Sequence, residues 1–252
     1  MRFPDFSSAS SIYDLFPDFE KYRDAVDIEN GRKTFPDLIE PEFNRVYETW
    51  KSATLLSTER AYNLFQAARY VAANQLAGDF VECGVLLGGA SIMLATFAEH
   101  FGVRDRKHYL FDTFSGSTKP TIETDYTDRK IVFGQTPSFR HIVEKNIARC
   151  EVDSARFALI EGSVHETLPS KELTSICVLR LDTDDYESTL HELRTLYPLL
   201  VPFGVLIIDD YGHYKGARKA VDEYFASIDE APLLQRTDYT GRCAVKVPRN
   251  GR

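Results

Sequence analysis

The sequence predicts an α/β protein built on a doubly wound, mostly parallel β-sheet. Short apolar, strand-like segments alternate with helical patterns from residue 57 onward. Nearly every predicted strand ends in an acidic residue, and a glycine-rich turn follows the first strand. In sheets of this class, ligands bind at the carboxyl ends of the strands, where the strand order reverses. The sequence therefore predicts both the fold class and the edge of the sheet that carries the site.

The predicted elements follow one another in a regular order. Ser57 or Thr58 caps the first helix, whose apolar residues recur at helical spacing. The predicted strands are 79–83, 108–111, 157–160, 176–181 and 205–208, and the helices between and after them are 92–101, 141–149, 186–200 and 215–228. Helix 186–200 is amphipathic and is expected to end near Pro202, because proline cannot continue a helix. The segment 232–247 predicts an antiparallel hairpin that turns around residues 239–241.

The first fifty residues form a separate compositional region. They are rich in aromatic and acidic residues and are interrupted by four prolines. This pattern predicts short helices and loops that wrap a core instead of a domain of their own. We therefore expect residues 1–55 to be a helical cover that does not fold independently, and residues 56–252 to be the main domain.

Composition and charge exclude several classes of protein. The chain has 252 residues and a formal net charge of −8, whereas broad nucleic-acid binding requires a basic face that neutralises phosphates. No apolar run approaches the roughly 20 residues that span a bilayer, and the N-terminus lacks the pattern of a signal peptide. The four cysteines are widely spaced and form no C-x-x-C pair. We expect a reduced, cytoplasmic protein that binds neither nucleic acid nor a membrane.

Residues 82–91 (ECGVLLGGAS) join the first strand to its helix and form the first candidate binding segment. Glycine allows a sharp turn and close approach to a ligand, and the helix N-terminus presents unpaired N–H groups. The candidate ligand-binding residues of this turn are Glu82, Gly84, Gly88 and Ser91. Because the spacing departs from G-x-G-x-x-G, the segment is either an ordinary strand–helix turn or a cofactor turn of another kind.

Three carboxylates are predicted to meet at the carboxyl edge of the sheet. Asp182 ends the fourth predicted strand, and Asp209 and Asp210 end the fifth. Neighbouring parallel strands lie about 5 Å apart, so these side chains repel one another unless they are protonated, paired with cations or bound to a metal. Arg180 is close in sequence, but strand alternation is expected to direct it elsewhere. Oxygen ligands without thiolate favour a hard cation, Mg²⁺ first; the alternative is that Asp182 and Asp210 only cap the helices that follow.

The glycine turn, E-x-G-x-x-x-G-G-x-S over residues 82–91, resembles the first motif of S-adenosylmethionine-dependent methyltransferases, and a metal at this edge suits methyl transfer to a hydroxyl group. It binds the acceptor oxygen and lowers its pKa, and a nearby base takes the proton. The candidate bases are Asp182 itself, His213 and His141, although each histidine has an ordinary structural or surface role as its alternative. Asp112 ends the second strand, where a carboxylate can bind the two hydroxyls of an adenosine ribose.

The motifs LDTDDYEST (181–189) and DDYG (209–212), together with the segment from Gly78 to Ser91, resemble the macrocin O-methyltransferase family. The resemblance covers roughly residues 55–247. It implies a Rossmann-like class I methyltransferase sheet, S-adenosylmethionine (SAM) as the methyl donor, a sugar or glycoside hydroxyl as the acceptor, and a homo-oligomer. It also implies Mg²⁺ on Asp182, Asp209 and Asp210. The SAM pocket implied by the family consists of the Glu82–Ser91 turn, Asp112, Gly162 and Ser163, with Thr58 near the methionine end.

The sequence departs from the family pattern at several positions. The glycine turn has Leu86-Leu87 where family members often carry Trp-Arg, and Asp185 replaces an apolar residue and adds charge beside the metal edge. The first fifty residues match weakly, in the region that usually shapes acceptor choice. Their aromatic side chains and the loop 117–138 form either a lid over a sugar ring or ordinary core and dimer contacts.

Other functions remain open at this point. A phenolic natural product is the alternative acceptor. A nicotinamide-dependent oxidoreductase explains the sheet and Asp112 but leaves the three carboxylates without a role. A binding module without catalysis does not need those carboxylates either.

Overall fold

A computed structural model of the chain describes residues 11, 40–116, 137–228 and 230–248. These residues contain a seven-stranded sheet with the order β3-β2-β1-β4-β5-β7-β6. The strands are β1 (Asp79–Cys83), β2 (His108–Asp112), β3 (Phe157–Glu161), β4 (Ile176–Leu181), β5 (Leu200–Ile208), β6 (Gln235–Arg236) and β7 (Arg242–Val245). Strands β1 to β5 are parallel, and β7 is antiparallel to both β5 and β6. The predicted sheet with an antiparallel C-terminal hairpin is confirmed.

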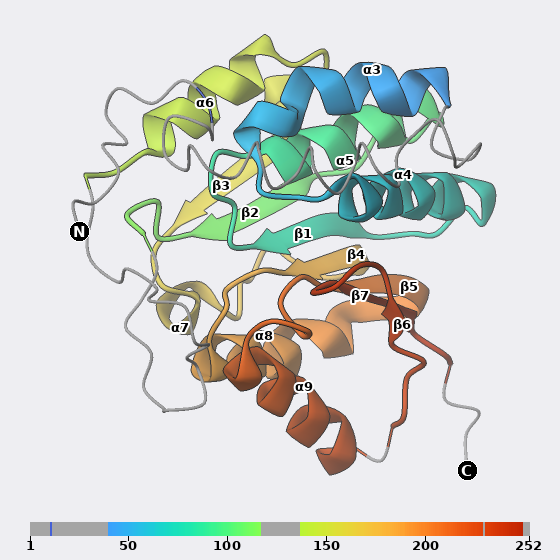
Figure 1. Ribbon diagram of the computed structural model, residues 1–252, viewed down its shortest axis with the longest axis vertical. Helices are drawn as coiled ribbons and strands as arrows, with labels where there is room; N and C mark the ends of the chain where they lie inside the picture. The colour runs from blue at the N-terminus through green and yellow to red at the C-terminus, as the bar shows by residue number, and fades with distance from the viewer. Residues whose placement is uncertain (1–10, 12–39, 117–136, 229, 249–252) are drawn as a thin grey trace.

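Helices cover both faces of the sheet (Figure 1). One face carries α3 (Pro41–Trp50), α4 (Thr58–Ala73), α5 (Gly89–His100) and α6 (Arg140–Arg149), and the other carries α7 (Val164–Thr167), α8 (Tyr186–Leu196) and α9 (Lys215–Ser227). Short 3₁₀ helices lie at Lys51–Ala53, Ser154–Arg156 and Tyr197–Leu199. Each helical layer buries its own apolar cluster against the sheet. Because β1 pairs with both β2 and β4, the strand order reverses there, and the carboxyl end of β1 is where this fold places a ligand.

The beginnings of α4 and α5 follow the expected chemistry. The Ser57 hydroxyl accepts a hydrogen bond from the Arg60 backbone N–H at 3.2 Å, so Ser57 is the N-cap of α4. Helix α5 begins at Gly89, three residues before the predicted start. Gly88 precedes it with φ of 83°, a left-handed conformation that glycine adopts without steric cost.

The predicted helix 186–200 is wrong in length. Helix α8 ends at Leu196, a 3₁₀ turn containing Pro198 follows, and β5 already begins at Leu200. The β4–β5 pairing then shifts, so that Ile176 lies opposite Leu200 and Val178 opposite Val205. Pro202 therefore lies in an irregular part of a strand, where a missing N–H is tolerated.

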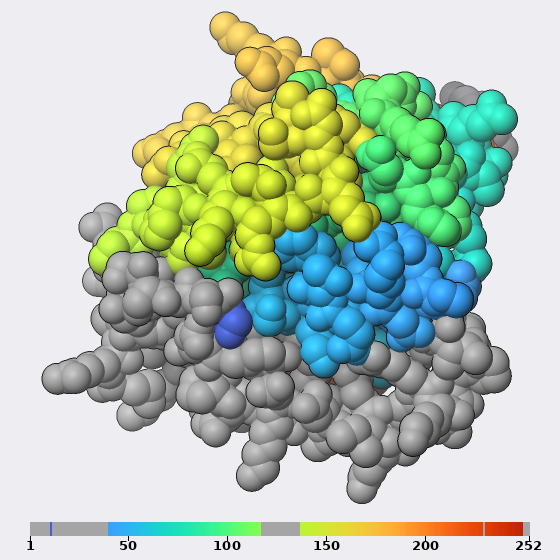
Figure 2. Space-filling view, turned by 90° about the horizontal axis from the view of Figure 1, so that it is seen from above, coloured from blue at the N-terminus to red at the C-terminus, as the bar shows by residue number. Residues whose placement is uncertain are grey.

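Helix α3 packs on α5 as part of the same core. The Phe43 ring lies 6.1 Å from the ring of Phe97, and Arg45 pairs with Glu151 at 2.9 Å. Figure 2 shows the blue surface of α3 against the yellow surface that follows α6. Most of the predicted N-terminal cover and of the loop 117–138 lies outside the described residues. The division of the chain at residue 55 stays a prediction.

Two further sequence expectations concern cysteines and membranes. All four cysteines are free thiols, and Cys83 and Cys177 are buried. Among the described residues, no helix combines the length and the apolar character needed to cross a bilayer.

A buried histidine makes folding sensitive to acid. His108 is 1% exposed, and its ring stacks between Phe80, at 4.6 Å, and Phe157, at 5.2 Å. Burial lowers its pKa from 6.5 to about 3. Between these two pKa values, His108 binds a proton in the unfolded chain but not in the folded chain. The stability that depends on the neutral, buried ring is therefore complete above the unfolded-state pKa and is lost as the pH falls. We expect the wild type to lose about 2 kcal/mol more unfolding free energy than His108→Phe between neutral pH and about pH 5.

Urea titrations at the two pH values measure this difference. His100→Gln, which changes a histidine with a 44% exposed side chain, is the control and should keep the wild-type pH dependence. An identical pH dependence for the wild type and His108→Phe would contradict the prediction.

Candidate active site

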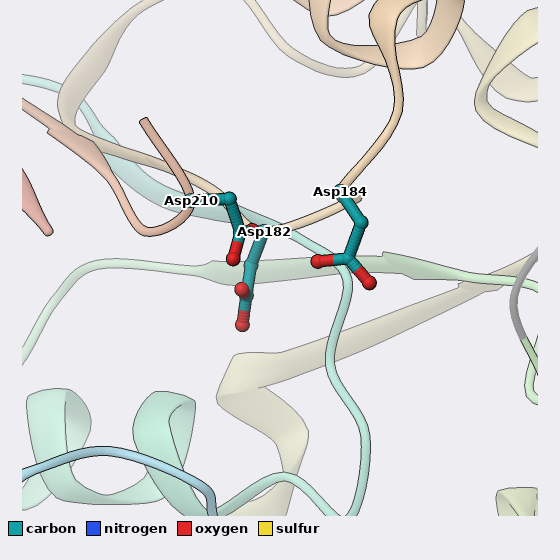
Figure 3. Close-up of side chains that lie close together, drawn as sticks. All are labelled: Asp182, Asp184 and Asp210. Carbon is teal, nitrogen blue, oxygen red and sulfur yellow. The ribbon is translucent and has the colours of Figure 1, made fainter. Parts of the chain in front are cut away.

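Three carboxylates gather at the carboxyl ends of β4 and β5. Asp182 follows β4, Asp210 follows β5, and Asp184 faces them from the loop after β4 (Figure 3). One oxygen of each carboxylate lies within 4.8 Å of the others. Asp184 was not among the predicted ligands, although its place in the motif LDTDDYEST was visible in the sequence.

The loop that carries Asp182 and Asp184 is held at both ends. The Asp182 backbone N–H donates to the Cys83 carbonyl at 2.9 Å, which joins the loop to the end of β1. The Asp185 carboxylate accepts from the Ser188 N–H at 2.8 Å and caps α8. Asp184, between them, has φ of 70°, a left-handed conformation that is strained for a residue other than glycine.

These caps decide between the alternatives for the acidic residues. Asp185 is the N-cap of α8, and Tyr214 is the N-cap of α9 without a side-chain cap bond. The alternative that Asp182 and Asp210 serve as caps is therefore wrong. The extra charge of Asp185 stabilises a helix N-terminus, where a negative charge is favourable.

A buried glutamate supports the loop from below. Glu192 of α8 is 0% exposed, and its carboxyl accepts a hydrogen bond from the Thr183 hydroxyl at 3.1 Å. Burial raises the pKa of Glu192 well above its usual value. The buried carboxyl group of Glu192 therefore anchors the residue between Asp182 and Asp184.

Arg180 contacts the carboxylates directly, and the expectation that it points elsewhere is wrong. Its side chain is 3% exposed and bonds Asp182 at 2.8 Å, Asp209 at 2.6 Å and Glu82. Residues two apart on a strand point to the same side, so Arg180 shares the side of Asp182.

A second arginine completes the network from α4. Arg60 pairs with Asp209 and, at 3.0 Å, with Asp238 of the β6–β7 hairpin. The Ser57 hydroxyl also donates to Asp238 at 2.8 Å. Arg60 and its partners lie 149 and 178 residues apart, and no sequence motif joins them.

The network has more negative than positive groups. Two guanidinium groups, of Arg60 and Arg180, contact the carboxyl groups of Glu82, Asp182, Asp209 and Asp238. Asp184 and Asp210 add two further carboxyl groups beside Asp182. This imbalance is expected to draw in protons or a cation.

The pKa shifts of the carboxyl groups indicate where the excess negative charge of the network lies. Burial opposes the charge of Asp209, but Arg60 and Arg180 hold the pKa of that carboxyl below its usual value. Burial, followed by the charges of Asp184 and Asp209, raises the pKa of Asp210 well above normal. Burial and the nearby Asp182 raise the pKa of Asp184 to about 7. Burial also raises the pKa of Asp182 well above normal, although Arg180 opposes this shift. The excess negative charge is therefore shared by Asp182, Asp184 and Asp210.

This part of the edge fits a hard cation. Asp210 is 7% exposed, and its Oδ2 atom has no hydrogen-bond partner among the described residues. An unpaired buried carboxylate oxygen is costly unless a cation or proton satisfies it. The donor set contains only carboxylate oxygens, which Mg²⁺ prefers. Both oxygens of Asp209, in contrast, contact arginines.

The glycine turn lies directly against the carboxylates. Gly84 has φ of 82°, and a Cβ atom at this position would collide with the Asp182 backbone carbonyl. Beneath the turn, the Glu82 carboxylate accepts from Ser91 and from Arg180. The Glu82 carboxylate is therefore occupied by hydrogen bonds from Ser91 and Arg180. The backbone of the turn is the part that faces the carboxyl edge of the sheet.

Asp112, a predicted ribose ligand, lies beside this turn. Its Oδ2 atom accepts from the backbone N–H of Val85 at 2.6 Å and of Leu86 at 3.2 Å. The Gly162 N–H donates to the Asp112 carbonyl at 3.0 Å, and Ser163 caps α7. The carboxyl ends of β1, β2 and β3 thus bring three predicted cofactor segments together.

Thr58 takes a more interior position. It is 2% exposed, and its hydroxyl donates to the Tyr47 hydroxyl at 3.1 Å. The nearby N-terminus of α4 still reaches the site, because Arg60 extends from it to Asp209.

The two predicted histidine bases occupy different places. The backbone N–H of His213 donates to the Asp210 carbonyl at 3.0 Å, so this histidine adjoins the carboxylates. Its Nδ1 atom contacts the Tyr239 hydroxyl. His141 lies exposed on α6, and no hydrogen bond or ion pair within the described part of the chain joins it to the carboxylates.

Known proteins match this chain across the whole site. The family model for macrocin-O-methyltransferases (TylF) matches residues 46–243. A demethyldecarbamoylnovobiocin O-methyltransferase of Streptomyces niveus is 32% identical over 192 residues, which cover 75% of this chain and 73% of that protein. An 8-demethyl-8-(2,3-dimethoxy-alpha-L-rhamnosyl)-tetracenomycin-C 4'-O-methyltransferase of Streptomyces olivaceus is 30% identical over 198 residues, 76% of each chain. The solved structure of the O-methyltransferase NovP has a TM-score of 0.69 and 26% identity, and covers 92% of this chain and 100% of its own.

Proposed function

The chain belongs to the macrocin O-methyltransferase family and is a SAM-dependent O-methyltransferase with a class I sheet, and we propose that it methylates a sugar hydroxyl with the help of Mg²⁺. The observation that carries the metal part of this proposal is the cluster of Asp182, Asp184 and Asp210, with an unpaired oxygen on Asp210. Membership of the family excludes the nicotinamide-dependent alternative.

The SAM site that we propose is the turn from Glu82 to Ser91, with Gly84 and Gly88 shaping its backbone. Asp112 holds the backbone N–H groups of this turn and lies where it can bind the ribose hydroxyls. Gly162 and Ser163 flank the adenine side, and the N-terminus of α4, with Thr58, flanks the methionine side. Each of these segments ends at the same edge of the sheet.

The metal ligands that we propose are Asp182, Asp209 and Asp210, joined by Asp184. Each carboxylate oxygen has two lone pairs, so the arginine contacts of Asp209 do not prevent it from serving as a ligand. When bound, Mg²⁺ supplies a Lewis acid that lowers the pKa of an acceptor hydroxyl. Arg180 keeps Asp182 and Asp209 in fixed orientations beside the SAM turn.

A base near the edge takes the acceptor proton. Asp182 and His213 remain candidates, and His141 is the more distant one. Asp184 joins them, because its carboxylate lies in the same cluster as that of Asp182.

The acceptor class that we propose is a sugar hydroxyl. The name of the tetracenomycin relative includes a rhamnosyl unit, which supports a glycosidic acceptor. A phenolic hydroxyl is the second candidate, because the same edge can activate either oxygen. A homo-oligomer, implied by the family resemblance, also stays a prediction.

An acceptor screen tests this function. The full chain is incubated with SAM, Mg²⁺ and a panel of glycosides, nucleotide sugars and phenols, and products are detected by mass spectrometry. We expect sugar acceptors to gain one methyl group, with activity lost in EDTA and restored by Mg²⁺. Products from phenols alone would overturn the sugar proposal, and full turnover in EDTA would overturn the metal proposal.

A further inference from the structure

Three aromatic side chains lie together beside the carboxylates, and of these only His213 has a role above, as a candidate base. They are His213, Tyr214 and Tyr239, here called the aromatic rim. The His213 ring lies 4.6 Å from the ring of Tyr214 and 5.5 Å from that of Tyr239, edge to face in both cases. The Tyr239 hydroxyl contacts His213 Nδ1. The three rings therefore form one continuous aromatic surface.

Backbone hydrogen bonds fix the aromatic rim to the carboxylate edge. The N–H groups of His213 and Tyr214 donate to the Asp210 carbonyl at 3.0 and 2.9 Å. The Thr240 hydroxyl donates to the Asp209 carbonyl at 2.8 Å, which holds the hairpin turn against the end of β5. The segment 213–214 and the hairpin turn are thus held against Asp210 and Asp209, two neighbouring candidate metal ligands.

A second set of contacts shapes the turn that presents Tyr239. The Asp238 carboxylate accepts from the N–H groups of Thr240 and Gly241 at 2.9 and 2.6 Å. A Cβ atom on Gly212 would collide with the Tyr239 carbonyl, so the two segments approach as closely as a glycine allows. The position of Tyr239 relative to the carboxylates is therefore determined by the fold.

The aromatic rim is accessible and amphipathic. Tyr239 is 48% exposed, whereas Tyr214 is largely withdrawn from solvent near Asp184 and Asp210. Burial and these carboxylates raise the pKa of Tyr214, so its phenol keeps its proton and serves as a donor. The surface thus offers ring faces together with hydroxyl and imidazole groups.

We propose that the aromatic rim is the acceptor subsite and that it binds a pyranose ring, with the C–H face of the sugar on Tyr239 and its hydroxyls toward Tyr214 and His213. This inference rests on the proposed function and names the residues that select its acceptor. A pyranose has an apolar C–H face bordered by hydroxyl groups, and it needs an aromatic face with polar groups at its margin. A sugar seated there presents a hydroxyl to the carboxylates next to the SAM turn.

Ligand-observed NMR tests the subsite directly. The full chain with S-adenosylhomocysteine and Mg²⁺ is mixed with methyl α-L-rhamnopyranoside, methyl α-D-glucopyranoside or catechol, and saturation transfer to each ligand is measured. We expect transfer to the ring C–H protons of a glycoside. Tyr239→Ala should reduce this signal about tenfold, while Tyr239→Phe, which keeps the ring, should retain it.

Matched controls separate the subsite from a loss of folding. Phe203→Ala removes an aromatic side chain of β5 that is 50% exposed, close to the 48% of Tyr239. This substitution should leave the sugar signal unchanged. S-adenosylhomocysteine affinity, measured by calorimetry, should be the same in all variants. If Tyr239→Ala lowers that affinity, the Tyr239→Phe comparison alone decides whether the ring is required.

The outcomes also separate this inference from the proposed function. No glycoside signal on the wild type, or an equal signal in Tyr239→Ala, would overturn the subsite. Transfer to catechol alone would overturn a sugar as its ligand. A Tyr239-dependent glycoside signal without methyl transfer in the acceptor screen would support the subsite and contradict the proposed function.

Discussion

Replacing Arg180 with methionine is expected to lower the unfolding free energy by about 3–5 kcal/mol. The substitution keeps a long apolar stem but removes the guanidinium group that contacts Glu82, Asp182 and Asp209. Buried carboxylates then lose their main counter-ion, and this cost exceeds the few tenths of a kcal/mol typical of a surface pair. Urea denaturation at neutral pH measures the change.

Arg218→Met is the matched control. Arg218 is paired with Asp222 on α9, where both side chains are more than half exposed, so its removal should cost under about 1 kcal/mol. The deficit of Arg180→Met should also shrink as the pH falls, because the unpaired carboxylates take up protons in the folded state. A deficit equal to that of Arg218→Met would show that the buried network does not stabilise the fold.

The second large effect is expected at Asp182. Asp182→Asn keeps the shape of the side chain but removes a charge that lies within the carboxylate cluster and contacts Arg180 at 2.8 Å. We expect turnover to fall about 100-fold or more, while S-adenosylhomocysteine binding stays close to that of the wild type. Initial rates with an acceptor from the screen, together with calorimetry, measure the two effects.

Asp185→Asn provides the control for this prediction. Asparagine is as good an N-cap as aspartate, so α8 keeps its cap and turnover should stay within about twofold of the wild type. Unchanged turnover in Asp182→Asn would refute the role of Asp182. Mn²⁺ titrations followed by electron paramagnetic resonance, on Asp184→Asn and Asp209→Asn, then identify which of these carboxylates belongs to the ligand set.

The alternation of strand and helix patterns was sufficient to predict the sheet and the edge that carries the site. Each element depends mainly on its own residues: Ser57 caps α4 through a bond within one turn, and β1 and β4 lie within the predicted bounds. The boundary between α8 and β5 was wrong, because the pairing of β5 with β4 decides where the strand begins. Tertiary pairing there overrides the local helical pattern.

Some features of the site likewise depend on local sequence, and others depend on contacts between residues far apart in the chain. The motifs around Asp182 and Asp210 are contiguous in the sequence, and they predicted a carboxylate edge of a methyltransferase without any coordinates. Which groups share that edge depends on contacts between residues far apart in the chain: Arg60 reaches Asp209 from α4, and Tyr239 reaches His213 from the hairpin. A motif fixes the sequence position of a charged or aromatic residue, but the folded structure determines which distant residue contacts it. The sequence by itself therefore determined the fold class and the chemistry of the edge, and the tertiary structure decided which charges are balanced and what surface faces the acceptor.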